Sequence, residues 1–244
     1  MNDGNAAVYD FRGEGEILFI DKPLDWTSFD VVKKMRSLFD VRKVGHAGTL
    51  DPKATGLLIV CTGKKTKRID QFVGMEKEYT GVCELGVRTP SFDSETSAHE
   101  SKDSSDITEH KIWDVAQSLL GKQMQVPPMY SAVKYGGKPL YRYARAGKTV
   151  DRVEREIDVV EFSILGMRHP FVEYSIVCTK GTYIRSLIDE FGLRLGCGAT
   201  VTELRRTRIG TYHVSNAMTM EKLMKWRETI RIKDQVLDEM YSAH

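Results

Sequence analysis

The sequence predicts an α+β fold with a mixed, largely antiparallel sheet, flanking helices and one inserted arm. Two observations lead to this prediction. Segments with strand-like apolar patterns outnumber segments with helical spacing. Short turn-forming connections also join strand-like segments, as between residues 156–165 and 171–180. Strands joined by such turns pair antiparallel, and the amphipathic helices then cover a face of the sheet.

The predicted strands show either alternation or a continuous apolar run. Residues 77–87 alternate between two kinds of side chain, which is typical of a strand with two unlike faces. Residues 57–61 are all apolar and indicate a buried strand. The other predicted strands cover residues 16–20, 156–165, 171–180, 200–205 and 208–214.

The predicted helices begin at polar capping residues. Thr27 and Asp30 form a capping-box sequence, and apolar residues at helical spacing then continue to about Asp40. Thr182 is expected to cap a helix that ends at Gly196. Further helices are expected just before Phe72, over residues 112–119, and from about Thr219.

The composition limits the class of protein. The chain has 244 residues, of which 41% are hydrophobic and 29% charged, which is ordinary for a globular protein with an ample core. Its apolar runs are shorter than a membrane span, and the polar start lacks a signal region, so we expect a cytoplasmic protein. The four cysteines form no CxxC pair, so we expect buried thiols and neither a metal site nor a disulfide frame.

The net charge of +2 conceals two segments of opposite charge. Residues 130–155 hold seven basic and two acidic side chains interleaved with four tyrosines, whereas residues 91–110 hold six acidic and one basic. Cations follow phosphates and aromatic rings stack on unpaired bases, so the basic segment is expected to be a mobile RNA-contacting arm hinged at Gly136 and Gly137. The alternative is an amphipathic surface helix with its tyrosines facing inward. Residues 90–108 are expected to form an exposed loop.

One loop carries the candidate catalytic residue. Residues 45–56 contain three glycines and one proline, which disfavours a regular helix or central strand, and they lead directly into the apolar run 57–61. Asp51 is the single carboxylate in this loop. The alternative for Asp51 is a turn residue that bonds to its own backbone. The glycine–lysine turn that follows is no P-loop, because Gly56 and Gly63 are too far apart and Lys65 stands where Ser or Thr is required.

The loop resembles the signature loop of the TruB-type tRNA pseudouridine-55 synthase family. The matching residues are Gly45, His46, Gly48, Leu50, Asp51, Pro52, Ala54, Gly56, Leu57 and Leu58. Segments that match the same family in the same order are residues 21–23, 77–79, 128–134, 180–187 and 204–206. The resemblance extends from about residue 16 to about residue 225, and it implies the pseudouridine synthase fold.

The resemblance implies an isomerase that converts uridine to pseudouridine at position 55, in the T-loop of tRNA, after flipping the base. It implies that Asp51 is the nucleophile, that Arg185 keeps it ionised, and that Tyr79 stacks on the uracil. Attack at C1′, attack at C6 and action as a base remain open for Asp51. From the residues alone, the favoured interpretation is that Arg185 pairs with Asp189 one helical turn away and that Tyr79 faces the core.

The resemblance also implies a set of substrate-binding residues. Tyr183 and Leu204 are expected to line the uracil pocket, with simple packing as the alternative, and His46 is expected to fill the space that the extruded base leaves. Lys22 is expected to support the loop or to meet a phosphate. Further phosphate contacts are expected from the basic residues of segments 42–68 and 205–208, among them Lys64, Arg205, Arg206 and Arg208. The reaction needs no metal and no cofactor, and none is predicted.

The expected organisation is one catalytic domain over residues 16–230, with residues 125–155 as the arm. Residues 1–15 are expected to be a polar extension, and residues 231–244 a tail that frays from a helix. Many bacterial relatives continue into a PUA-type RNA-binding domain that this chain is expected to lack. The expected partner is therefore the T-arm stem-loop of tRNA, with no membrane and no protein partner implied. The alternatives are a non-catalytic tRNA-binding or folding module, and a glycosylase that would release uracil.

Overall fold

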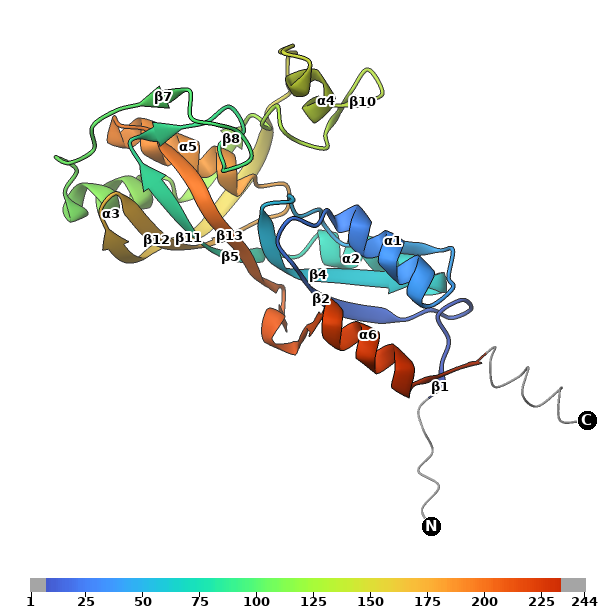
Figure 1. The fold of residues 1–244 in the computed structure, drawn as a ribbon. Coiled ribbons are helices and arrows are strands. Elements are labelled where there is room, and N and C mark those ends of the chain that lie inside the picture. Colours follow the sequence, from blue (N-terminus) through green and yellow to red (C-terminus); the bar gives the residue numbers. More distant parts are fainter. Residues whose placement is uncertain (1–7, 234–244) are drawn as a thin grey trace, which may run out of the picture. The chain divides into compact units, whose positions relative to one another are not determined.

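The computed structural model describes residues 8–233, which form two compact units (Figure 1). The first unit contains residues 8–75 and 206–233, and the second contains residues 76–205. Strand β13 (Ala199–Ile209) contributes its last residues to the first unit and its earlier residues to the second. Both units combine helices with sheet strands that pair mainly antiparallel, which confirms the predicted α+β fold.

The strands of the first unit are arranged around β4 (Ala54–Thr62). Strand β2 (Ile17–Lys22) pairs antiparallel with β4 over residues 17–22 and 56–61. β15 (Met218–Thr219) pairs parallel with β2, which makes the sheet mixed, as predicted. The remaining strands of this unit are short: β1 (Val8–Tyr9), β3 (Val44–His46), β14 (Tyr212–His213) and β16 (Arg231–Ile232).

The helices of the first unit begin where their capping residues predict. Helix α1 (Ser28–Leu38) has Thr27 as its N-cap, and Thr27 and Asp30 form the predicted capping box. Thr219 caps α6 (Met220–Thr229), because its side chain accepts the backbone N–H of Lys222. The short helical segments are η1 (Gly63–Arg68), α2 (Ile69–Val73) and η2 (Val214–Asn216).

Strand β4 is buried on both faces because its side chains alternate between two apolar clusters. Leu58 and Val60 pack with residues of α1, β2 and α6. Leu57, Ile59 and Cys61 pack with Phe72 of α2 and Ile209 of β13. The continuous apolar run in the sequence therefore reflects burial on two sides, and it fixes the strand that leaves the Asp51 loop.

The expected polar N-terminal extension is partly wrong. Phe11 is fully buried, and its ring stacks on Phe39 with centroids 4.0 Å apart. β1 pairs parallel with β16, so described residues at both chain ends pack against the first unit. The apolar residues Val8, Tyr9 and Phe11 are too few to show a period, and the partner Phe39 is distant in the chain, so the sequence did not reveal this contact. The expected extension at residues 1–7 and the expected tail at residues 234–244 lie outside the described residues.

The second unit contains the predicted hairpin. β11 (Arg155–Arg168) pairs antiparallel with β12 (Phe171–Cys178), and β12 pairs antiparallel with β5 (Lys77–Leu85). β8 (Gly121–Gln125) pairs with the other edge of β11, and β13 lies beside β5. β13 is one continuous strand, whereas two strands were expected, because its three arginines do not interrupt the alternation of the strand.

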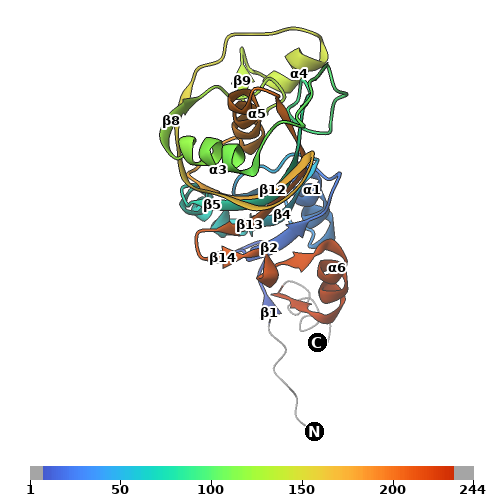
Figure 2. The ribbon, with the colours of Figure 1, turned by 90° about the vertical axis from the view of Figure 1, so that its left-hand side faces the viewer.

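Helices α3 (Glu109–Ser118) and α5 (Ile184–Leu195) pack side by side over this sheet (Figure 2). The ring of Phe191 in α5 lies 5.3 Å from that of Phe162 in β11. α5 ends at Gly196 in the left-handed conformation, as predicted. The expected cap at Thr182 is wrong, because the N-cap position is Tyr183 and the Thr182 hydroxyl donates to the Thr179 carbonyl.

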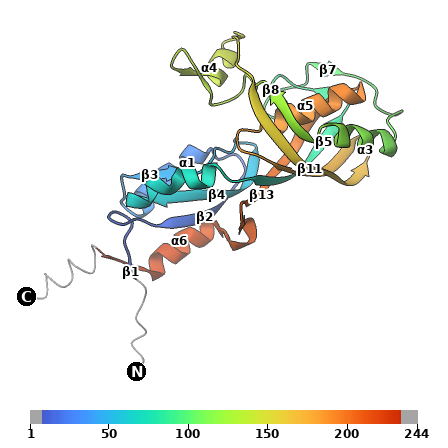
Figure 3. The same cartoon turned by 180° about the vertical axis from the view of Figure 1, so that it is seen from behind.

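The predicted arm is a hairpin followed by a short helix, and it projects from the rest of the second unit (Figures 1 and 3). β9 (Lys134–Tyr135) pairs with β10 (Lys138–Pro139), and α4 (Leu140–Arg145) follows. Gly136 and Gly137 were expected to be a hinge, but both have positive φ and form the two-residue turn of this hairpin. The alternative of one amphipathic helix through the arm is wrong.

The acidic segment 90–108 is more ordered than the expected exposed loop. β6 (Val87–Arg88) pairs with β7 (Glu100–Ser101) across it. Ser91, Asp93 and Ser104 within it are buried. Its polar composition hid this burial, because the side chains are satisfied by hydrogen bonds rather than by apolar packing.

Two further expectations concern the cysteines and membrane spans. All four cysteines are free and buried, as expected, and burial raises the pKa of Cys61 to about 11 and that of Cys83 to about 12. Among residues 8–233, every helix is too short or too polar to cross a membrane.

Candidate active site

The loop that carries Asp51 lies in the first unit, between β3 and β4, and is fixed at several points. The Ala47 N–H donates to the Ile59 carbonyl at 2.9 Å. The buried hydroxyl of Ser28, at the start of α1, accepts from the Leu50 N–H at 2.9 Å and donates to the Leu50 carbonyl at 3.3 Å. Asp51 follows at once, half-buried, and its carbonyl accepts the N–H of Ala54. The loop therefore presents Asp51 from a fixed backbone.

Lys22 is a fully buried cation beside this loop. Its ammonium donates to the carbonyl oxygens of Pro23 at 2.9 Å, Trp26 at 2.5 Å and Pro52 at 3.5 Å. Burial lowers its pKa to about 8, and the negative charge of Asp51 opposes that lowering. Of the two roles expected for Lys22, its burial and its bond to Pro52 favour support of the loop over contact with a phosphate.

We expect Lys22 to make the folded chain more stable as the pH rises above 8. Its pKa is about 8 in the folded chain and about 10.4 in an unfolded one. Between these values the unfolded state holds a proton that the folded state has lost, so the free energy of unfolding rises by up to about 1.4 kcal/mol per pH unit. Urea unfolding of the wild type and of Lys22→Met at pH 7 to 10 measures this effect. The difference between the two proteins should be flat below pH 8 and grow above it, and a constant difference would contradict the expectation.

His46 ends β3 on the approach to the loop and is partly exposed. Burial is the main cause that lowers the pKa of His46, and the positive charge of Arg206 lowers this pKa further. The ring is therefore neutral near pH 7. Its Nδ1 is buried and makes no hydrogen bond within the described part of the chain.

Arg206 enters this site from β13, which corrects an expectation. It was expected to contact phosphate, but its side chain is 1% exposed. Its Nε donates to the Leu57 carbonyl at 2.8 Å, and Nη2 donates to the Gly48 carbonyl at 3.1 Å. Basic residues next to one another in sequence resemble a phosphate-binding run, and burial of one of them on a strand cannot be read from that pattern.

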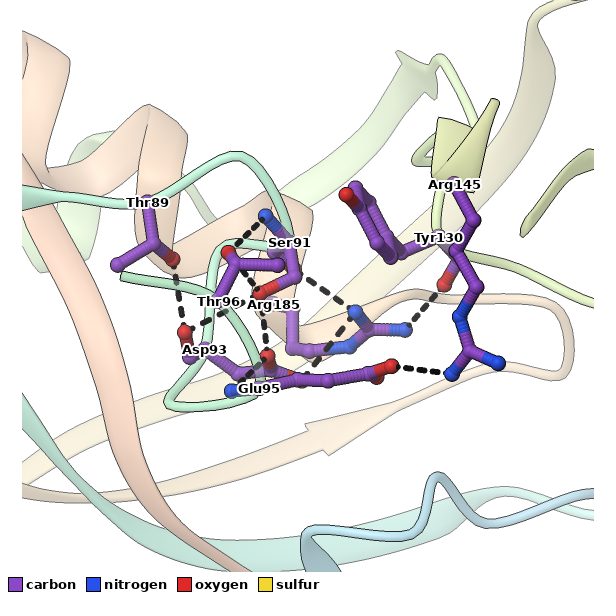
Figure 4. A network of polar contacts seen from close by, with 8 residues as sticks. All are labelled: Thr89, Ser91, Asp93, Glu95, Thr96, Tyr130, Arg145 and Arg185. Carbon is purple, nitrogen blue, oxygen red and sulfur yellow. Dashed lines mark hydrogen bonds and ion pairs between the residues drawn. The ribbon is translucent and has the colours of Figure 1, made fainter. Parts of the chain in front are cut away.

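Arg185 lies in the second unit, in the first turn of α5, and is 2% exposed. Its Nη1 pairs with Asp93 at 3.3 Å and donates to the Ser91 carbonyl at 2.7 Å, while Nη2 donates to the Tyr130 carbonyl at 2.8 Å (Figure 4). Asp189, the alternative partner, is bound by both Nε and Nη2 of Arg88. The pairing of Arg185 with Asp51 remains a prediction.

Asp93 is the residue of this network that sequence reasoning missed. It is 3% exposed, accepts the Ser91 hydroxyl at 2.6 Å and accepts the Glu95 N–H at 2.9 Å. Its only local signal is the Ser–x–Asp–x–Glu spacing of a side-chain-bonded turn. Glu95 in the same turn pairs with Arg145 of α4 at 2.7 Å, so the turn connects the arm to the Arg185 network (Figure 4).

The other predicted base-contacting residues also lie in the second unit. Tyr79 is a buried residue of β5, opposite Ile176 of β12. The backbone of Tyr183 is held by Gln125, whose side-chain amide accepts from the Tyr183 N–H at 2.8 Å and donates to its carbonyl at 3.0 Å. Leu204 is buried on β13.

Of the remaining predicted cations, Arg205 and Arg208 are half-buried on β13. Lys64, in the first unit, is exposed and pairs with Glu14 at 2.6 Å, which raises its pKa. The structure thus brings Lys22 close to Asp51 in the first unit, and His46 lies in the same unit, where the loop begins. Within residues 8–233, no three His, Cys, Asp or Glu side chains form a group that could hold a metal.

The arm presents cations, and three of its tyrosines contact other residues of the arm. The Tyr143 hydroxyl donates to the Tyr135 carbonyl at 3.1 Å, and the Arg145 guanidinium lies 5.5 Å from the centre of the Tyr141 ring. Six of its seven basic side chains are exposed, while Arg152 donates to the Pro127 carbonyl. The exposed cations are Lys134, Lys138, Arg142, Arg145, Lys148 and Arg155.

Comparisons with known proteins give one consistent family. Residues 36–184 match the model of the TruB family pseudouridylate synthase N-terminal domain. Residues 185–242 match the model of the tRNA pseudouridylate synthase B C-terminal domain. The tRNA pseudouridine synthase B of Chloroherpeton thalassium is 49% identical over 88% of this chain and 93% of its own length. That of Chlorobaculum tepidum is 45% identical over 92% of this chain and 95% of its own length.

Two solved structures are similar over nearly the whole chain. The first is a Cbf5–Nop10–Gar1 complex, with 30% identity, a TM-score of 0.69 and coverage of 93% of this chain. The second is an H/ACA ribonucleoprotein bound to a substrate RNA containing 2′-deoxyuridine, with 27% identity, a TM-score of 0.67 and coverage of 94%. This chain spans 62% and 63% of the two matched chains.

Proposed function

This chain belongs to the TruB family of pseudouridylate synthases and isomerises uridine to pseudouridine in tRNA, and we propose that its target is the uridine at position 55 of the T-loop. The family supports the choice of target, and the observation that supports the chemistry is the Asp51 loop, which holds one half-buried carboxylate on a fixed backbone beside a buried cation. We propose that the enzyme acts in the cytoplasm and requires no protein partner.

The proposed reaction breaks the N1–C1′ bond of uridine and joins C5 to C1′; C5 loses its proton and N1 gains one, so that the composition is unchanged. Asp51 is the proposed carboxylate, acting at C1′, at C6 or as the base that removes a proton. Arg185 is proposed as a guanidinium required for the reaction. Its bonds to Asp93, Ser91 and Tyr130 support this role, because they hold the head group in one position.

The base must leave the RNA stack before it reacts, which costs a few kcal/mol and costs less in a loop than in a duplex. Tyr79 is proposed to stack on the flipped uracil, with Tyr183 and Leu204 as further walls of its pocket. His46 is proposed to fill the space that the base vacates. Its lowered pKa supports this role, since a neutral ring stacks among bases without a charge to desolvate.

RNA binding is proposed to rest on the arm, with Lys64 and Arg205 as further phosphate contacts. We expect the affinity for tRNA to fall steeply with salt, because each phosphate contact releases a counterion. The triple variant Lys134→Ala, Lys138→Ala, Arg142→Ala should make the negative slope of the log of the association constant against log[salt] shallower by about 2, at about 0.7–0.9 per contact. Fluorescence anisotropy between low and moderate salt measures the slope.

The matched control for this experiment is Lys222→Ala with Lys225→Ala, two cations on α6 of the first unit. This double variant should leave the slope unchanged. An equal decrease in both variants would show that the salt dependence reflects overall charge and not the arm.

Substrate mapping tests the T-loop proposal. Wild-type protein is incubated with full-length tRNA, with a T-arm stem-loop and with an anticodon stem-loop, and pseudouridine is located by carbodiimide derivatisation. We expect one modified uridine, in the T-loop, in the first two RNAs and none in the third. An unmodified T-arm stem-loop, or modification elsewhere in the full-length tRNA, would refute the proposal.

A further inference from the structure

Arg206 closes the base of the Asp51 loop with its side chain. Nε and Nη2 donate to the carbonyls of Leu57 and Gly48, which lie after and before Asp51 in the chain. A guanidinium is a rigid planar fork of donors, so two such bonds fix the separation of the two carbonyls. The loop between Gly48 and Leu57 is thereby held at both ends by one head group.

The backbone of Arg206 approaches the same loop. Gly56 has φ +104°, and a Cβ at this position would lie 2.3 Å from the Arg206 carbonyl oxygen and 2.8 Å from its nitrogen. Only glycine permits this approach. The side chain and the main chain of one residue therefore both contact the segment that leads from Asp51 into β4.

Burying the charged guanidinium of Arg206 costs folding free energy, which suggests that this charge serves the site. A guanidinium stays protonated in proteins, and a buried charge is unfavourable relative to an apolar side chain of similar volume. Its positive charge lowers the pKa of both Lys22 and His46, and Lys22 itself interacts with Asp51, so the charge of Arg206 acts beside the loop. Full burial also removes it from direct phosphate contact.

We propose that Arg206 is a positioning residue for the isomerisation: it fixes the two ends of the 48–57 loop so that the Asp51 carboxylate is held in its reactive position. The proposal rests on the proposed role of Asp51. Under this proposal, Arg206 affects the rate of the reaction and not the affinity for RNA. Its neighbours Arg205 and Arg208 are instead expected to contact phosphate.

The test compares wild type, Arg206→Ala, Arg206→Lys and Asp51→Asn on tRNA, with the single-turnover rate, the tRNA Kd and the folded fraction measured for each. We expect Arg206→Ala to lower the rate per folded molecule by about 100-fold, the size of effect that a small misplacement of a reacting group has. The Kd should stay within about twofold. Methylguanidinium at millimolar concentration should raise the rate of Arg206→Ala at least tenfold, because the vacated site retains the two carbonyl acceptors.

Matched controls identify what is restored. Urea at the same concentration should not restore the rate, and methylguanidinium should not activate Asp51→Asn. If Arg206→Ala does not fold, Arg206→Lys keeps the charge but not the fork. It should then show about a tenfold lower rate and faster deuterium exchange in residues 48–57 than wild type.

Two outcomes would overturn the proposal. One is a rate per folded molecule that is the same as in wild type for both Arg206→Ala and Arg206→Lys. The other is a weakened Kd with an unchanged rate, which would return Arg206 to RNA binding. A fully active Asp51→Asn would instead refute the proposed role of Asp51, and loss of T-loop modification by the wild type would refute the proposed target, so these failures are distinguishable from failure of the Arg206 proposal.

Discussion

Asp51→Asn is expected to lower the rate of pseudouridine formation by at least about 10³-fold, because an amide neither attacks carbon nor accepts a proton as a carboxylate does. The side chain keeps its size, and the loop is held by backbone bonds of Ala47 and Leu50 that the substitution does not touch. Folding and tRNA affinity should therefore remain close to those of wild type. Single-turnover assays on tRNA, with pseudouridine located by derivatisation, measure the rate.

Asp25→Asn is the matched control for this substitution. Asp25 is an exposed carboxylate of the same unit, paired with Lys53 at 2.7 Å, and its loss should leave the rate within about twofold, as for other exposed ion pairs. Retained activity in Asp51→Asn would refute the assignment of the carboxylate. Release of free uracil by the wild type would instead indicate a glycosylase.

Asp93→Ala is expected to destabilise the second unit by about 3–5 kcal/mol, the usual effect of removing one member of a buried ion pair. Arg185 and Asp93 are 2% and 3% exposed, so water cannot replace the lost carboxylate. The Glu95 N–H loses its carboxylate acceptor in the same substitution, and the Ser91 hydroxyl loses the shorter of its two bonds to Asp93. Urea unfolding followed by circular dichroism measures the change.

Glu100→Ala provides the comparison for Asp93→Ala. Its side chain is 52% exposed and pairs with Arg88 at 3.0 Å, so its removal should cost no more than about 1 kcal/mol. Combining Asp93→Ala with Arg185→Met should recover part of the lost stability, because no unpaired buried cation remains. Equal losses for Asp93→Ala and Glu100→Ala would show that the buried pair has no special role.

Local rules predicted much of the fold. The Thr27–Asp30 cap, the apolar run of β4 and the β11–β12 hairpin each depend on residues close together in sequence, and each is confirmed. Phe11 was missed because its partners, such as Phe39, are distant in the chain. Two strands were expected where β13 is continuous, and the continuous strand accommodates a buried arginine that finds carbonyl acceptors.

The site was only partly predictable for a similar reason. Asp51 stands in a loop whose glycines and proline make it conspicuous, and Lys22 was expected beside it. Asp93 was missed and Arg206 was misassigned, because their roles depend on burial and on distant partners. Arg206 bonds to Leu57, 149 residues away in the chain. The network of Asp93 likewise depends on Arg185, which bonds to Ser91 across 94 residues. Pairwise contacts of that range leave no periodicity in a single sequence.

The packing of β4 in two apolar clusters has a consequence for how rigidity is distributed. To open the segment that follows Asp51, the chain would have to release side chains from both clusters at once, so that opening should require nearly the free energy of global unfolding. The arm, by contrast, is a two-residue turn and a six-residue helix anchored by buried Leu140. We therefore expect amide hydrogen exchange to be much slower in the segment that follows Asp51 than in the arm.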